Sequence, residues 1–487
     1  MKRVLTLMMS LAIVLTLAIG GLPAALAEEE LPTLKVLGPY LNFDPNTDPT
    51  AIAIEECTGY HVEYSMLPAE NADENLLLQI ASGETYDILR ISPAQYRQLL
   101  EMGALMPLDD LLAEYGPNLT SLITDEAYEL VQSDGQTYGI PMMAEREVIS
   151  AAVQYRKDIL DELGMEAPTT PEEFHDVLAA VKEAYPDMIP LCLAGGVWVP
   201  TLVSGFGFYT NWVDRDGKIV NYQQLPEYQD YLNYMKSLYD EGLLDADLPI
   251  NTTVTVDEKF SSGRAFAVSS GWYEASTQVP ALMENLPDAE VAYLDPLYDA
   301  NGNAGVATAY ALNNVTCIPK NAEHAEDAVK FMNAKLEPDT FTYITLGTEG
   351  ETFTIDEDGN YYPIMPIFTE LRNNAWWYLN SFDMTRYGDM WMARTRRNEA
   401  LGEAFDAINA NFDQFAVRNP VDFAPVLPSV AENSAALSQM ESDYQIQVMV
   451  GVESLDNFDT YLQGWLDAGG QACLDEYNEW YATTQAE

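Results

Sequence analysis

The chain is poor in basic residues and in histidine. Only 23 of its 487 residues are Lys or Arg, against 77 Asp and Glu, which gives a formal net charge of −54 at pH 7. Such a charge repels nucleic acid and anionic membrane surfaces, so neither is expected as a partner. The three histidines, His61, His175 and His324, lie far from one another and from any nucleophile motif. Catalysis based on a histidine or on a known catalytic motif is therefore not predicted.

Cysteine is equally scarce. Cys57, Cys192, Cys317 and Cys473 are widely separated, and no Cys-x-x-Cys pair is present for zinc binding or redox chemistry. Each lies in an apolar context, where a buried free thiol is the commoner state, although an exported protein can form disulfides. The disulfide state stays open at this point, and neither a cofactor nor a metal is predicted.

Long apolar runs are missing except at the N-terminus. Lys2 and Arg3 precede a run from Val4 to Leu22, which leads to the small-residue site Ala25-Leu26-Ala27. This order is typical of a cleaved signal peptide, to which we assign residues 1–27. An uncleaved membrane anchor is the alternative, because the run is nearly long enough to span a bilayer. We expect an exported protein, located extracellularly or in the cell envelope.

Short apolar runs alternate with helical stripes between Leu34 and Ile91. The order strand, helix, strand, helix, strand predicts an α/β fold with a mostly parallel sheet that has helices on both faces. Ligands of such sheets lie beyond the carboxyl ends of the strands. This rule directs attention to residues 38–43 and 90–93 as the border of a binding crevice.

The most informative stretch runs from Tyr155 to Phe174 and reads YRKDILDELGMEAPTTPEEF. A helix from Lys157 is expected to end at Gly164, where a left-handed residue costs least. A second helix is expected to begin at Thr170, which can form a capping box with Glu173. The sequence therefore predicts a helix-loop-helix that packs against a larger body.

The units Tyr-Arg-Lys-Asp, Leu-Gly and Pro-Thr-Thr in this block resemble the segment after the first interlobe crossing in extracellular solute-binding proteins (family 1, carbohydrate-type) of bacterial ABC importers. Similar matches follow in order at 269–273, 314–319 and 346–350. The resemblance spans nearly the whole mature chain. It implies a two-lobed periplasmic-binding-protein-like fold, with a mostly parallel sheet flanked by helices in each lobe and a helical C-terminal region.

The resemblance also implies a division of the chain. Crossings between the lobes are expected near Pro141 and between Val291 and Ile318. The N-terminal lobe would contain residues 31–145 and about 295–345, and the C-terminal lobe residues 146–294 and about 346–487. Relatives from Gram-positive bacteria often carry a lipid on a Cys at the cleavage site. The first Cys here is Cys57, which argues against a lipid anchor.

Proteins of this family capture a solute between the lobes, close by a hinge motion and present the closed form to the permease subunits of the importer. The resemblance implies a carbohydrate ligand, with an oligosaccharide expected, a monomer, and no enzymatic step. Two alternatives stay open. A secreted glycan-degrading enzyme would share the export signal, the acidity and the aromatic residues, and the same fold could bind peptides or act as a sensor.

Aromatic side chains are the expected sugar contacts, because a flat ring covers the apolar face of a pyranose while polar groups bond its hydroxyls. The chain has 8 Trp and 29 Tyr, and Trp272 follows a Gly at a strand end, where ligand could approach the backbone. Packing in the core is the alternative role for Trp272. The predicted ligand-binding residues are Tyr40, Arg90, Trp198, Trp272, Tyr273, Trp376 and Trp377.

Two further expectations concern these residues. Adjacent residues on a helix point in different directions, so at most one of Trp376 and Trp377 should line the cleft. Arg90 ends a predicted strand at the crevice, where a guanidinium could bind a uronic acid carboxylate, fork between sugar hydroxyls or form an interlobe ion pair. The basic cluster Arg394, Arg396 and Arg397 is interpreted as a solvated helix face.

Overall fold

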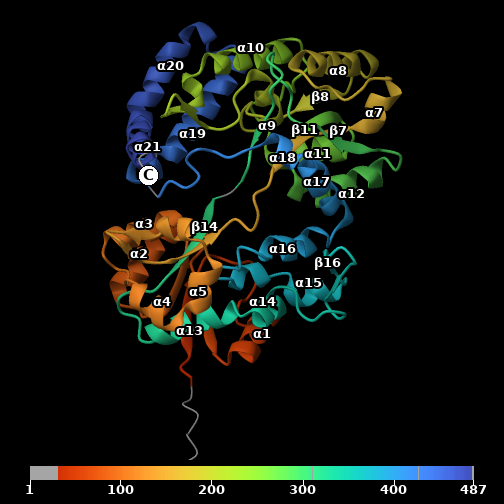
Figure 1. Ribbon diagram of the computed structural model, residues 1–487. Coiled ribbons are helices and arrows are strands. Elements are labelled where there is room, and N and C mark those ends of the chain that lie inside the picture. Colours follow the sequence, from red (N-terminus) through yellow and green to blue (C-terminus); the bar gives the residue numbers. More distant parts are fainter. Residues whose placement is uncertain (1–30, 310, 426, 485–487) are drawn as a thin grey trace, which may run out of the picture.

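The computed structural model describes residues 31–309, 311–425 and 427–484, so the predicted signal peptide lies outside the described residues. Figure 1 shows two lobes, one above the other, that are joined by several passages of the chain. The lower lobe holds the N-terminal strands and helices, and the upper lobe holds the C-terminal helices. No helix in the described ranges is long and apolar enough to cross a membrane.

The first lobe is built on a five-stranded sheet with the order β2-β1-β3-β14-β6. β1, β2 and β3 pair in parallel, whereas β14 runs antiparallel to both of its neighbours. The strands are β1 (Leu34–Gly38), β2 (Val62–Met66), β3 (Ile88–Ile91), β6 (Ile140–Met143) and β14 (Leu312–Cys317).

Helices cover both faces of this sheet. Helix α1 illustrates the local cause, because Asp48 caps it through the amide of Thr50 at 2.8 Å and Pro49 occupies the first position. The helices are α1 (Pro49–Thr58), α2 (Ala72–Ser82), α3 (Pro93–Glu101), α4 (Asp109–Tyr115), α5 (Pro117–Leu122), α6 (Asp125–Glu129), α13 (Ala325–Lys335), α14 (Pro338–Thr345), α15 (Ile367–Arg372), the 3₁₀-helix η4 (Ala375–Tyr378) and α16 (Tyr387–Thr395).

The second lobe has a four-stranded sheet with the order β12-β7-β11-β8. β11 and β8 are parallel, and β7 runs antiparallel to both β11 and β12. The strands are β7 (Ala151–Arg156), β8 (Ile189–Cys192), β11 (Ala265–Gly271) and β12 (Val291–Tyr293).

The helices of the second lobe fall into two groups, one around the sheet and one at the C-terminus. Around the sheet lie α7 (Lys157–Glu162), α8 (Pro171–Ala184), α9 (Pro200–Val203), η1 (Ser204–Phe206), η2 (Tyr222–Gln224), α10 (Pro226–Asp240), α11 (Thr253–Ser261), η3 (Trp272–Glu274), α12 (Ala275–Asn285), α17 (Glu399–Asn409) and α18 (Phe412–Phe415). The C-terminal group is α19 (Pro428–Met449), η5 (Leu455–Asn457), α20 (Phe458–Trp465), the π-helical turn η6 (Leu466–Gly470) and α21 (Gln471–Thr484).

Four two-stranded ribbons complete the fold. They pair β4 (Gln132–Ser133) with β5 (Gln136–Thr137), β9 (Trp212–Arg215) with β10 (Lys218–Asn221), β13 (Val306–Ala307) with β17 (Ala416–Val417), and β15 (Phe353–Ile355) with β16 (Tyr361–Pro363).

Within each sheet, all strands but one run in the same direction, which confirms the predicted mostly parallel sheets. The reversed strands are β7 and β14. Each follows a passage from the other lobe, so it enters its sheet from the edge that faces the cleft. For the same reason the carboxyl ends of β1, β2, β3 and β11 lie at that edge, where ligands of such sheets bind.

Within the described ranges, three segments connect the lobes, near residues 144–150, 308–309 and 396–398. The first two segments touch through an isolated bridge between Val148 and Ala309. The third segment was not predicted. Its position follows from packing, because α16 contributes Met390 to the core of the first lobe, whereas Ala404 of α17 packs on Val279 in the second lobe.

The predicted division at about residue 346 therefore needs a correction. Leu346, Phe368 and Ala393 belong to the hydrophobic core around the first sheet, whereas Leu297 belongs to the core of the second lobe. Residues 346–395 thus pack on the first lobe, and the chain leaves the second lobe later than residue 295. The apolar pattern of a helix indicates that one face is buried, but not which lobe covers it.

The helix-loop-helix after β7 forms as predicted. Gly164 has a φ of +67°, and Thr170 caps α8 by accepting the amide of Glu173 at 3.2 Å. The reciprocal bond differs, because the Glu173 carboxylate accepts the amide of Thr169 at 2.8 Å. The four cysteines, all within the described residues, are free thiols.

Candidate ligand-binding site

A cavity of about 240 Å³ lies between the lobes and is lined by four tryptophans, which we call the tryptophan cavity. Both lobes and two of the connecting segments contribute to its walls. The lining residues are Glu145, Trp272, Tyr273, Trp376, Trp377, Trp391, Arg394, Thr395, Arg397 and Leu401.

The second lobe contributes Trp272 and Tyr273, which follow β11 directly. Gly271 at the end of β11 pairs with Ala151 at the start of β7, so both side chains emerge at the cleft edge. The Trp272 ring lies edge-on to Trp391 of α16, with the centroids 5.5 Å apart. Trp272 therefore lines the cavity and also packs across the boundary between the lobes.

Gly271 has a different role from the one expected. A Cβ at this position would lie 2.5 Å from a ring carbon of Tyr273, so the glycine makes room for the Tyr273 ring. The space beside Gly271 was expected to admit a ligand. The exposed Tyr273 ring instead forms part of the cavity wall.

The first lobe contributes Trp376 and Trp377 from η4. Their ring planes are 88° apart and their centroids 4.7 Å apart. Both rings line the cavity, so the prediction that only one would do so was wrong. The tight 3₁₀ turn and the perpendicular rings let two adjacent side chains share one wall.

Arg90, at the end of β3, lies behind the two tryptophans and is only 4% exposed. Its guanidinium carbon lies 4.8 Å from the centroid of Trp376 and 5.8 Å from that of Trp377. Such cation–π contacts fix both rings from the protein side. Burial lowers the pKa of Arg90 to about 10, while the nearby Glu145 opposes this shift.

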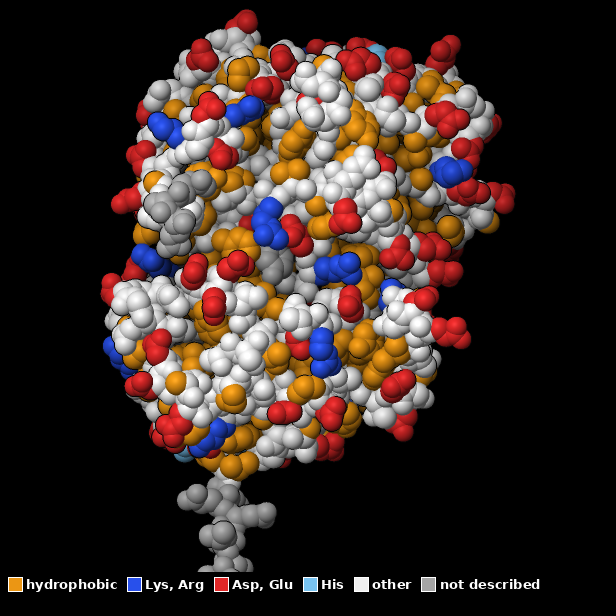
Figure 2. All heavy atoms as spheres, in the orientation of Figure 1, with side chains coloured by type: hydrophobic (Ala, Val, Ile, Leu, Met, Phe, Trp, Pro, Cys, Tyr) orange, Lys and Arg blue, Asp and Glu red, His pale blue; other side chains and the backbone are white. Residues whose placement is uncertain are grey.

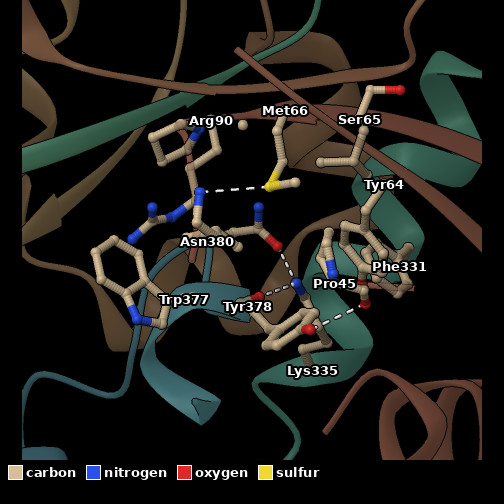
Figure 3. Close-up of a pocket in the computed structure, with 14 residues that line it drawn as sticks. Pro45, Tyr64, Ser65, Met66, Arg90, Phe331, Lys335, Trp377, Tyr378 and Asn380 are labelled. Carbon is tan, nitrogen blue, oxygen red and sulfur yellow. Dashed lines mark hydrogen bonds between the residues drawn. The ribbon is translucent and has the colours of Figure 1, made fainter. Parts of the chain in front are cut away.

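Arg90 lines a second, narrower cavity of about 30 Å³ at the carboxyl ends of β1, β2 and β3 (Figure 3). Lys335, from the last turn of α13, lies at the other side, and we call this space the Arg90–Lys335 cavity. Trp377 lines both cavities, which are therefore neighbours. The lining is completed by Val36, Gly38, Pro39, Leu41, Pro45, Tyr64, Ser65, Met66, Phe331, Tyr378 and Asn380.

Lys335 is a buried lysine with neutral hydrogen-bond acceptors. Its Nζ donates to the carbonyl oxygen of Tyr378 at 2.8 Å and to Oδ1 of Asn380 (Figure 3). Burial, together with the charge of Arg90, lowers the pKa of Lys335 to about 7. The ammonium group is thus close to losing its proton at neutral pH.

Charged residues that the sequence analysis missed complete the tryptophan cavity. Glu145, in the first connecting segment, has a pKa raised by burial, which the guanidiniums of Arg394 and Arg90 oppose. Arg394 and Arg397 also line the cavity. The interpretation of this basic cluster as a solvated helix face was wrong for Arg394, which is half-buried and donates to the carbonyl oxygens of Arg372 and Asn373, whereas Arg397 is exposed. The helix dipole favours basic residues at the C-terminal end of any helix. Their presence at the end of α16 therefore did not indicate a ligand.

Two predicted residues lie elsewhere. Tyr40 is 53% exposed and lines neither cavity, although its neighbours Pro39 and Leu41 line the Arg90–Lys335 cavity. Trp198 lines a separate cavity of about 230 Å³ in the second lobe, beside Glu441. Its ring packs 4.5 Å from the ring of Tyr222.

Polar contacts tie the first connecting segment to its neighbours. Glu147 in the first segment accepts the Arg418 guanidinium at 2.5 Å and the hydroxyl of Thr308 at 2.6 Å. Arg146 lies beside Asp389 of α16 at 3.9 Å. In the described part of the chain, no group of three or more His, Cys, Asp or Glu side chains is placed to hold a metal ion.

The fold and the interlobe cavity are those of a solute-binding protein. The chain belongs to the bacterial extracellular solute-binding protein family, whose model matches residues 51–350. It is 37% identical over 252 residues to an uncharacterized protein from Niallia circulans, covering 52% of this chain and 98% of the relative. It is 24% identical over 499 residues to the polygalacturonan/rhamnogalacturonan-binding protein YtcQ of Bacillus subtilis, covering 96% and 97%.

Solved structures show the same fold. The substrate-binding protein FusA of Streptococcus pneumoniae, in complex with kestose, superimposes with a TM-score of 0.70 at 19% sequence identity. The match covers 93% of this chain and all of FusA.

Proposed function

We propose that this protein is the solute-binding component of an ABC transporter and that it binds a carbohydrate, with an oligosaccharide as the expected ligand, in the tryptophan cavity. The observation that carries this proposal is the convergence of Trp272, Trp376, Trp377 and Trp391 from both lobes on one cavity. Flat rings cover the apolar faces of sugars, and the charged and hydroxyl groups between them can bond the sugar hydroxyls.

A ligand that contacts both lobes favours the closed state, because the open state offers it only one wall. Closure would be a hinge motion about the connecting segments, the first of which follows Pro141 and the second of which precedes Asn313. The closed monomer would then dock on the permease subunits of the importer. A dissociation constant near micromolar needs only about −8 kcal/mol, which one or two stacked rings and a set of hydrogen bonds can supply.

The relatives support a carbohydrate ligand, since YtcQ is named for binding polygalacturonan and rhamnogalacturonan and FusA was solved with kestose. We infer that no covalent step takes place. Glycoside hydrolysis uses a pair of carboxylates on either side of the scissile bond. Among the described residues that line the tryptophan cavity, Glu145 is the single carboxylate.

A thermal-shift screen tests the proposal. The protein is melted with neutral and uronic oligosaccharides, amino acids and peptides, because a ligand that binds only the folded state raises the melting temperature. A rise with a glycan that is lost in Trp377→Ala but kept in Trp480→Ala supports the proposal, since Trp480 lies on α21 outside the cavity. A rise with peptides and with no glycan would overturn the carbohydrate assignment.

A further inference from the structure

The cleft is basic, although the protein is strongly acidic. Arg90, Lys335, Arg394 and Arg397 line the two neighbouring cavities, and Glu145 is the one acidic residue among the described side chains that line them. The whole chain has 77 acidic against 23 basic residues. Figure 2 shows Asp and Glu over the whole visible face, whereas several of the few Lys and Arg lie where the lobes meet. This reversal of charge indicates an anionic ligand.

Arg90 and Lys335 are buried cations whose hydrogen-bond partners in the described structure are all neutral. Nε of Arg90 donates to the carbonyl oxygen of Leu379 at 3.1 Å, and Nη2 lies 3.6 Å from the sulfur of Met142. Nη1 is buried and makes no hydrogen bond within the described part of the molecule. Buried charges are normally paired, since an unpaired one costs several kcal/mol.

Tyr64 adds a second unsatisfied group to the same cavity. Its buried hydroxyl makes no hydrogen bond to any described residue. Buried polar groups in folded proteins nearly always have a partner, so two unsatisfied groups in one small space indicate a missing acceptor. A group with negative charge would satisfy the Arg90 guanidinium and the Lys335 ammonium at the same time.

The size and position of the cavity define that group. A volume of about 30 Å³ holds roughly two water molecules, which suits a carboxylate and excludes a pyranose ring. Ser65 and Met66, which are exposed, form part of the wall of this cavity. Trp377 lines both this cavity and the tryptophan cavity. A sugar ring that stacks in the tryptophan cavity would have this cavity next to it.

We propose that the Arg90–Lys335 cavity holds a carboxylate of the bound glycan, so that the protein selects carboxylate-bearing oligosaccharides. This inference rests on the proposed function. The carboxylate can belong to a uronic acid or to a sialic acid, because both sugars carry this group. Arg90 supplies the forked donor that matches a carboxylate, and Lys335 supplies a point charge.

Isothermal titration calorimetry on the wild-type protein decides the question. Trigalacturonate is compared with the neutral galactotriose, and sialyllactose with lactose. We expect at least one acidic sugar to bind about tenfold or more tightly than its neutral counterpart, the usual value of a charge-assisted hydrogen bond. The acidic sugar that shows the preference identifies the source of the carboxylate.

Lys335→Met and Arg90→Gln should then lower the affinity for the acidic sugar more than the affinity for the neutral one. Lys330→Met is the matched control for Lys335, because Lys330 lies on the same helix but is half-exposed, pairs with Glu326 and lies outside the cavity. Arg97→Gln serves likewise for Arg90, since Arg97 pairs with Glu101 on α3. Melting temperatures show whether each variant folds. If a variant does not fold, the comparison of acidic with neutral sugars on the wild-type protein still decides the question.

The other outcomes separate the two proposals. Equal affinity for acidic and neutral sugars would overturn the carboxylate site, because the cavity would then hold only water, while glycan binding would stand. Tight binding of acidic sugars that is unchanged in both cavity variants would overturn it as well. No binding of any sugar would overturn the proposed function itself.

Discussion

The two lobes provide the cleft with different chemistry. The second lobe offers Trp272 and Tyr273, which are neutral. Phe405 of the same lobe and Trp391 of the first lobe pack on the Trp272 ring. The first lobe offers two tryptophans backed by a guanidinium, and a buried lysine beyond them. From this difference we predict that the first lobe recognises the ligand, whereas the second lobe covers it with an apolar surface.

This comparison predicts that the largest loss of affinity comes from the first lobe. Trp377→Ala removes a ring that is 39% exposed and lines both cavities. The ring can bury most of its free face on a sugar, which is worth about 2 kcal/mol, or about thirtyfold in affinity. Calorimetry with the best glycan from the thermal screen measures this change. An unchanged affinity would show that the first lobe is not the recognising one.

Trp272→Ala should weaken binding less, by about tenfold, because part of the ring is already used in packing. The centroid of Phe405 lies 5.3 Å away and that of Trp391 5.5 Å away. The fold should remain intact, as judged by circular dichroism. If affinity does not change at all, Trp272 is a packing residue. A loss larger than that of Trp377→Ala would reverse the roles of the lobes.

Much of the fold could be predicted because local chemistry determines it. Asp48-Pro49 begins a helix, Gly164 ends one, and Thr170 caps the next, each through contacts within a few residues. The alternation of strands and helices then limits the choice to an α/β sheet. The boundary of the first lobe at residue 346 was wrong, because it depends on which lobe a buried helix face meets.

The site could be predicted only in part for the same reason. Trp272 and Tyr273 were predicted at the cleft because they follow a strand that ends there, and both line the tryptophan cavity, while their contact with a ligand stays a prediction. Glu145, Arg394 and Arg397 were missed, since their meeting depends on packing between segments about 250 residues apart in the chain. Trp198 has the right residue type and follows a β-strand, but it lies beside a different cavity. Composition shows which side chains are available and not where they converge.

The buried lysine of the first lobe should make stability depend on pH. The pKa of Lys335 is about 7 in the folded protein, against an ordinary value of 10.5. Burial and the charge of Arg90 lower this pKa, and Cys57 opposes the shift. The unfolded chain therefore binds one more proton between pH 7 and about 10.5, and the free energy of unfolding rises with pH over this range by at most about 1.4 kcal/mol per unit.

Urea unfolding of Lys335→Met at pH 7, 8 and 9 tests this expectation. The variant should lose the rise that the wild type shows, whereas Lys330→Met on the same helix should keep it. Because the other titratable groups are the same in wild type and variant, their contributions cancel when the two free energies of unfolding are subtracted at each pH. Parallel curves for wild type and Lys335→Met would mean that the lysine keeps its proton in the folded state and is stabilised by a partner.

The second lobe should show a smaller dependence of the opposite sign. Burial beside Trp198 raises the pKa of Glu441 to about 8 from 4.5. The folded protein then holds the extra proton between these values, so the free energy of unfolding falls as pH rises from about 4.5 to 8. Glu441→Gln can still accept the hydrogen bond from Nε2 of Gln445 and should remove that fall, while Glu432→Gln, at an exposed position on the same helix, should not. The effect should be smaller than that of Lys335, because Glu441 is only partly buried and water can reach its carboxylate. Equal curves for Glu441→Gln and wild type would place the charge of Glu441 in solvent and leave Lys335 as the one buried charge of this pair that affects stability.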